Sequence, residues 1–191
     1  PNDVKVKTYD FDFEKTDGTN KLNGAEFELY AAWDNSRNQP GGTAIELLTP
    51  TADSVTYKKA DSDDAANKTT TIVVDSLENG DYYTKISGLG GLDNETGTNY
   101  YLVETKAPDG FNKLAKPIIV NVKDNGTITV SFNGNTLDSA NDAFDVVNST
   151  GPVMPGTGGI GTTIFYIVGA ILVIGAGVVL ITRRRMSAHE E

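Results

Sequence analysis

The C-terminal part of the chain contains a long apolar segment without a charged residue, Ile164–Thr182. At about 1.5 Å per residue, a helix over this segment would reach roughly 28 Å, close to the thickness of a membrane's hydrocarbon core. The basic cluster Arg183–Arg185 follows directly, and the positive-inside tendency therefore places Glu191 in the cytoplasm and Pro1 outside. A buried core helix is the alternative, although such helices are mostly shorter. The sequence thus predicts an extracellular part, one transmembrane helix and a cytoplasmic tail.

A short Pro/Gly-rich motif precedes the apolar segment and consists of Met154, Pro155, Gly156, Thr157 and Gly158. Motif, apolar span and basic tail together resemble the cell-wall sorting signal of Gram-positive surface proteins, Leu-Pro-x-Thr-Gly, with Met154 in place of Leu. Met is an apolar residue of similar size, so a Leu pocket could accept it. The resemblance implies that a sortase cuts between Thr157 and Gly158. It would then join Thr157 to an amine of peptidoglycan, of its lipid-linked precursor or of a neighbouring pilin subunit, which makes membrane contact transient. A flexible linker is the alternative interpretation.

The composition of the part before the motif excludes several kinds of site. The net charge is −10, and only Glu190 and Glu191 among the acidic residues follow the motif. An acidic surface disfavours nucleic acid and anionic lipid as partners. There is no cysteine, and the single histidine, His189, lies in the predicted tail, so we expect neither disulfides nor a histidine-based catalytic site. We also expect no cofactor and no metal, because the acidic stretch 61–64 lacks the spacing of an EF-hand loop.

The same part of the chain is dominated by strand patterns. Phe11 and Phe13 alternate with acidic residues, and Phe27 and Leu29 do so in the next apolar stretch. The expected strands are 10–15, 25–30, 69–74, 82–86, 100–104, 118–122, 127–132 and 144–147. Clusters of Gly, Asn and Asp predict loops at 17–24, 34–42, 87–99 and 133–142, and a hairpin turn at 124–126. With no long helical period before the motif, we expect an antiparallel β-sandwich of about seven to nine strands.

Three stretches resemble the Cna B-type domain of Gram-positive surface proteins and pilins, and they follow that family's order. Residues 15–30 are similar to its opening strands, and 144–148 to its final strand. Residues 101–111, Tyr-Leu-Val-Glu-Thr-Lys-Ala-Pro-Asp-Gly-Phe, resemble the pilin E-box. The similarity spans roughly Lys5 to Arg185 and is weaker from 34 to 76. It implies an Ig-like, Cna B-type sandwich.

The resemblance also implies an intramolecular isopeptide bond between Lys15 and Asn148, assisted by Glu104 of the E-box. A lysine attacks only as the neutral amine, and burial lowers its pKa. The same burial raises a carboxyl pKa, so a neutral Glu104 could donate a hydrogen bond to the Asn148 carbonyl and transfer protons as ammonia leaves.

Each of these residue types is ordinarily found on the surface, and the joint pattern favours the cross-link. Lys5 and Lys7 are competing amines, and Asn141 is a competing acceptor. Such a bond would strengthen an exported domain that has no cysteine, and it would leave the protein one ammonia lighter than its sequence.

The predictions divide the chain into a Cna B-type sandwich (1–150), a sorting-signal linker (151–163), the transmembrane helix (164–182) and the basic tail (183–191). Because the chain starts with Pro1, we expect a signal peptide and further domains upstream. The resemblance implies a structural subunit of a Gram-positive pilus serving adhesion, with no enzymatic turnover. The alternatives are the stalk of a monomeric wall-anchored adhesin and a wall tether for an upstream enzyme. The resemblance implies that polymerisation uses a pilin-motif lysine, typically within Tyr-Pro-Lys and usually in an earlier domain; here Tyr57-Lys58-Lys59 lacks the proline.

Overall fold

The computed structural model describes residues 7–51, 54–64, 66–75, 83–91, 95–137, 143–151 and 172. Contacts within the chain divide it into two units, Pro1–Gly151 and Pro152–Glu191. The predicted sorting motif and, apart from Leu172, the predicted membrane segment lie outside the described residues. Among those that are described, no helix is long and apolar enough to cross a membrane.

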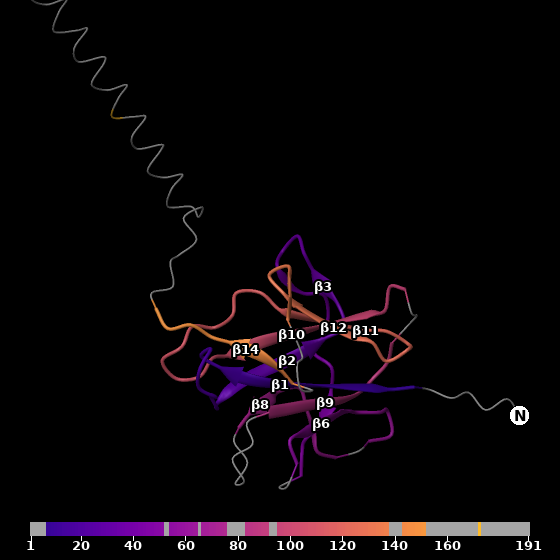
Figure 1. Ribbon diagram of the computed structural model, residues 1–191. Helices are drawn as coiled ribbons and strands as arrows, with labels where there is room; N and C mark the ends of the chain where they lie inside the picture. Colours follow the sequence, from indigo (N-terminus) through magenta and orange to yellow (C-terminus); the bar gives the residue numbers. More distant parts are fainter. Residues whose placement is uncertain are drawn as a thin grey trace, which may run out of the picture. The chain divides into compact units, whose positions relative to one another are not determined.

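The first unit contains two six-stranded β-sheets and one two-stranded sheet (Figure 1). The first sheet has the order β14 (Ala143–Val147), β1 (Tyr9–Thr16), β9 (Tyr83–Leu89), β6 (Thr56–Lys59), β5 (Leu47–Leu48) and β7 (Lys68–Thr69). The second has the order β13 (Asn135–Leu137), β12 (Ile128–Phe132), β11 (Ile118–Val122), β10 (Thr98–Lys106), β2 (Ala25–Tyr30) and β8 (Ile72–Val74). The small sheet pairs β3 (Trp33–Asp34) with β4 (Gln39–Pro40). The predicted all-β sandwich is confirmed.

Strand β1 lies between β9 and β14 in the first sheet. It pairs with β9 in the antiparallel direction but with β14 in the parallel direction, where Lys15 is opposite Val146. The other parallel pair is β6 with β9, and the remaining pairs are antiparallel. Because β1 and β14 run in the same direction, their C-terminal ends meet at one end of the sheet.

The core between the sheets is built by every second residue of each strand. Phe11, Phe13, Phe27 and Phe144 are its aromatic members, and each is at most 5% exposed. The rings of Phe13 and Phe27 meet edge to face, with centroids 5.2 Å apart, and those of Phe13 and Phe144 lie 5.9 Å apart. Since Phe13 belongs to the first sheet and Phe27 to the second, the edge-to-face contact joins the two layers.

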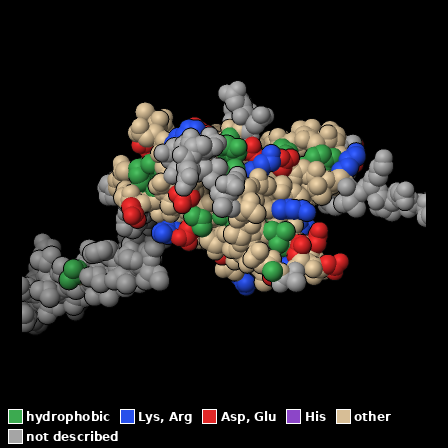
Figure 2. Space-filling model, turned by 90° about the horizontal axis from the view of Figure 1, so that it is seen from below, with side chains coloured by type: hydrophobic (Ala, Val, Ile, Leu, Met, Phe, Trp, Pro, Cys, Tyr) green, Lys and Arg blue, Asp and Glu red, His purple; other side chains and the backbone are tan. Residues whose placement is uncertain are grey.

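The outward-facing residues are mostly polar. On the face shown in Figure 2, acidic and basic side chains are interspersed, and hydrophobic side chains form small separate groups. In the described part of the first unit, the exposed large hydrophobic residues are Val73 and Val147. Both lie on sheet-edge strands, β8 and β14.

Each predicted strand is represented in the structure, and the predicted hairpin at 124–126 is confirmed. Lys123 and Thr127 close the hairpin with a 3.0 Å backbone hydrogen bond, and Gly126 has a φ of +88°, which an L-residue adopts only with strain. The segment 69–74 is divided between β7 and β8.

Five strands were not predicted: β3, β4, β5, β6 and β13. They are two to four residues long; β4 and β13 lie inside segments predicted as loops, and β3 overlaps one of them. So short a strand shows no alternation of its own, and its pairing depends on the longer strand beside it.

Candidate functional site

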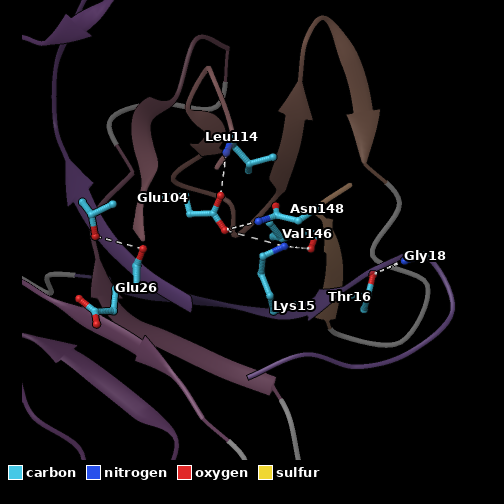
Figure 3. Close-up of polar contacts among 9 residues, drawn as sticks. Lys15, Thr16, Gly18, Glu26, Glu104, Leu114, Val146 and Asn148 are labelled. Atoms are coloured by element: carbon cyan, nitrogen blue, oxygen red, sulfur yellow. Dashed lines mark hydrogen bonds and ion pairs between the residues drawn. The ribbon is translucent and has the colours of Figure 1, made fainter. Parts of the chain in front are cut away.

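Three polar side chains are enclosed between the two sheets. Lys15 is 0% exposed, and Glu104 and Asn148 are each 1% exposed. Figure 3 shows the three side chains pointing toward one another. Ionisable side chains are almost never fully buried unless they are paired, so their common location calls for a specific interaction.

The strand pattern explains why these three side chains point inward. In each case two apolar residues occupy the preceding inward positions, and the polar residue takes the third. The inward-facing residues are Phe11, Phe13 and Lys15 on β1, and Tyr100, Leu102 and Glu104 on β10. On β14 they are Phe144 and Val146, and Asn148 continues the pattern one residue after the strand ends. Asn148 keeps the strand register, because its N–H donates to the Thr16 carbonyl at 3.0 Å.

The Glu104 carboxyl group lies at the centre of the site. Its Oε1 accepts a 2.8 Å hydrogen bond from Asn148 Nδ2 and lies 3.9 Å from Lys15 Nζ. Asn148 Oδ1 is buried and has no hydrogen-bond partner among the described residues. One carboxyl oxygen therefore faces both a primary amine and a side-chain amide.

Two backbone groups orient the side chains of this site. The Val146 carbonyl accepts a 2.6 Å hydrogen bond from Lys15 Nζ, and the Leu114 N–H donates to Glu104 Oε2 at 2.7 Å. With Oε2 occupied by a donor, an acidic proton on Glu104 belongs on Oε1, toward Asn148. These backbone contacts were not predicted, since every non-proline residue carries the same groups.

Burial displaces both titratable groups toward their neutral forms. Desolvation lowers the pKa of Lys15 from 10.5 to about 8, and the nearby Glu104 charge only partly opposes this shift. Burial likewise raises the pKa of Glu104, against the hydrogen bonds from Leu114 and Asn148 and the charge of Lys15. Moving one proton from Lys15 to Glu104 therefore costs much less here than in water.

The competing residues are not part of this site as far as they are described. Lys7 Nζ lies 3.5 Å from the Asp124 carbonyl and is exposed, while Lys5 and Asn141 are outside the described residues. Lys58 and Lys59 are exposed on β6. No group of three or more acidic or histidine side chains suited to a metal occurs among the residues that the structure describes.

Family comparisons identify both units of the chain. Residues 9–136 match the family model of the SpaA prealbumin-like fold domain, and residues 146–187 match the LPXTG cell wall anchor motif. The second match includes the predicted sorting motif with Met154 at its first position.

Individual proteins with sequence or structural similarity are fimbrial and pilus proteins. The chain is 30% identical over 168 residues to the fimbrial subunit type 1 of Actinomyces viscosus, covering 86% of this chain but 29% of that protein. The crystal structure of the group B streptococcus pilus 2b backbone protein is 22% identical, with a TM-score of 0.43, and the match covers 80% of this chain and 45% of that one. GBS52, the minor pilin of Streptococcus agalactiae, is 20% identical, with a TM-score of 0.42, 80% coverage of this chain and 48% of the other.

The chain thus spans less than a third of its fimbrial relative and about half of these solved chains. The domain match covers most of the sandwich, and the anchor match follows it in the order of a wall-anchored surface protein. The chain belongs to the SpaA family of prealbumin-like fold domains and is an extracellular, cell wall-anchored pilin protein of a Gram-positive bacterium.

Proposed function

We propose that the chain is the C-terminal, wall-proximal part of a structural pilus subunit, strengthened by an isopeptide bond between Lys15 and Asn148. The enclosure of an amine, a carboxyl and an amide on residues that are each at most 1% exposed is the observation that carries this proposal. As an uncrosslinked charged pair the cluster would be costly, because burial of two ions is poorly repaid by their attraction.

The reaction needs no reagent beyond the three side chains. Neutral Lys15 attacks Asn148 Cγ, and a new C–N bond forms while the Cγ–Nδ2 bond breaks. Glu104 accepts a proton from the attacking nitrogen and delivers one to Nδ2, which departs as ammonia. A half-turn of the Asn148 amide lets Oδ1 accept the Oε1 proton of Glu104, which stabilises the developing oxyanion. Protons balance, and Glu104 ends as it began.

The apolar surroundings support this chemistry. Phe13 and Phe144 lie on the strands that carry the amine and the amide, and both are at most 1% exposed. They favour the neutral amine and exclude water from the tetrahedral intermediate. Enclosure also holds the reactants together, so that a slow amide exchange becomes intramolecular.

The bond would serve a mechanical purpose. It would join β1 to the residue after β14, closing a loop of about 130 residues, which by analogy with a disulfide removes about 5 kcal/mol of chain entropy from the unfolded state. Tension along the chain would pass between the two adjacent strands without unfolding the rest of the sandwich. Unlike a disulfide, the link is insensitive to reductants.

The sorting motif supports a second covalent connection. We expect a sortase to cleave after Thr157 and to transfer that carboxyl to an amine of the wall or of a neighbouring subunit. The fimbrial relative favours polymerisation over the stalk and tether alternatives. An SDS-resistant ladder in wall extracts, lost in Thr157→Ala, supports polymerisation, whereas a single band supports a monomeric stalk or tether.

Intact-mass measurement tests the internal bond. The folded chain is expected to be one ammonia lighter than its sequence, and a branched peptide joining Lys15 to Asn148 is expected after digestion. Lys15→Ala, Glu104→Ala and Asn148→Ala should have unmodified masses, while Lys7→Ala should retain the loss. An unmodified wild-type mass in a folded sample would rule the bond out.

A further inference from the structure

The segment that follows β10 contacts both sides of the reacting cluster. It begins with a tight turn in which the Phe111 N–H donates to the Pro108 carbonyl at 3.1 Å, and Gly110 takes a φ of +85°. The turn reverses the chain and brings the next residues back toward Glu104 and toward the end of β14.

Asn112 holds the chain just after the acceptor residue. Its backbone N–H donates to the Ser149 carbonyl at 3.0 Å, and its side-chain Nδ2 donates to the Gly151 carbonyl at 2.6 Å. Ser149 directly follows Asn148. Two residues beyond Asn112, the Leu114 N–H donates to Glu104 Oε2.

The acceptor residue needs such support because it lies beyond the last residue of its strand. β14 ends at Val147, and Asn148 is held to β1 by one further backbone hydrogen bond. Residues 149–151 are exposed, so packing does not fix them. A chain free to move after Asn148 would let its side chain turn away from Lys15.

We propose that Asn112 is a positioning residue for isopeptide formation: it fixes Asn148 relative to Glu104 through a three-residue bridge, 112–114. This role rests on the proposed Lys15–Asn148 bond. Asn112 takes no part in proton transfer and does not contact the reacting atoms. Its loss lowers the fraction of time in which amine, amide and carboxyl are aligned. Because its hydrogen bonds are partly exposed, we expect a threefold to tenfold slower reaction.

The test measures the rate of ammonia loss in the full chain. The chain is synthesised without cells in the presence of detergent micelles, synthesis is stopped, and intact mass is recorded over time. Fluorescence of Trp33, the single tryptophan, shows when folding is complete. Asn112→Ala is expected to link threefold to tenfold more slowly than wild type after folding, and to reach the same final mass.

Asn121→Ala is the matched control. Its Nδ2 also bridges segments, donating to the Thr96 carbonyl at 2.9 Å and to Asn99 Oδ1 at 2.7 Å, toward the other end of β10. We expect its linking rate to equal that of wild type. A contact that merely stabilises the fold leaves the rate unchanged, since nearly every molecule is already folded.

Asn112→Asp keeps the side-chain size and the backbone donor but loses the Nδ2 donor. It replaces Asn112→Ala if the latter does not fold, and its linking rate should be no higher than the rate expected for Asn112→Ala. Linking at the wild-type rate in either folded variant overturns the positioning role alone. A wild-type chain that never loses ammonia overturns the proposed bond itself, and this role with it.

Discussion

Strand β1 carries two clusters of lysine and carboxylate on its opposite faces, and they differ in almost every physical property. On the inner face Lys15 lies beside Glu104, with both side chains 0% exposed. On the outer face Asp10 and Asp12 contact Lys85 of β9, whose side chain is 34% exposed. The outer cluster has the shorter ion-pair contact, from Lys85 to Asp10.

The two lysines have opposite pKa shifts. The hydrogen bond that Lys85 donates to Asp10, with the charges of both aspartates, raises the pKa of Lys85 despite some desolvation. Burial lowers that of Lys15 to about 8, although Glu104 is close. A nucleophilic amine therefore depends on burial rather than on the nearness of a carboxylate, and the outer lysine remains a solvated cation.

The largest expected difference is in stability. Lys15→Met, which keeps the apolar stem and prevents the bond, should lower the free energy of unfolding by about 5 kcal/mol. Lys85→Met should lower it by less than about 1 kcal/mol, because a surface ion pair contributes little. Denaturant unfolding followed by Trp33 fluorescence measures both, and equal losses would contradict the distinction.

The second difference concerns the carboxyl groups. Glu104→Gln keeps the shape of the side chain but removes its exchangeable acid proton, so we expect bond formation to slow by about 10² to 10⁴. Asp10→Asn makes the same chemical change in the outer cluster and should leave the rate unaltered. Time-resolved intact mass compares them, and a rapid Glu104→Gln reaction would exclude a proton-transfer role.

The third difference appears in the unlinked Asn148→Ala variant, where Lys15 still titrates. Its folded-state pKa, about 8, lies below the ordinary 10.5, so the unfolded chain binds the proton more tightly. The free energy of unfolding should therefore rise between pH 8 and pH 10.5, by about 3 kcal/mol.

Denaturation across this pH range measures that rise, after subtraction of the same curve for Lys15→Met/Asn148→Ala. The linked wild type should lack it, because its Lys15 nitrogen is an amide. A flat difference curve in the unlinked variant would mean that Lys15 keeps an ordinary pKa.

The smallest effect has the opposite sign and belongs to Lys85. Since its folded-state pKa is raised, its stabilisation is present below pH 10.5 and is lost as the pH rises through the folded-state value. We expect a change of less than about 1 kcal/mol that shrinks with added salt. Asp10→Asn should reduce this pH-dependent change. A free energy of unfolding that is insensitive to both salt and this substitution would show that the outer cluster contributes nothing to stability.

Local patterns account for most of what could be predicted. Alternation at Phe11 and Phe13 identified β1, and the same period assigns Lys15 to the inner face. Glu104 and Asn148 came from resemblance to a family rather than from periodicity, since a lone polar residue at a strand end has no pattern of its own. The short strands β3 to β6 and β13 escaped prediction for the same reason.

Composition and period two are local properties of the chain, so they were enough to predict the all-β class and the acidic surface, whereas the anchor motif and the residues proposed for a cross-link came from resemblance to a family. The tertiary structure alone decided that β1 and β14 are parallel neighbours, that Glu104 faces both Lys15 and Asn148, and that Asn112 and Leu114 hold the two sides of the site. Pairing between residues 131 positions apart depends on how all strands together bury their apolar faces. The orienting N–H and C=O groups are the same at almost every residue, so only folding selects which of them act.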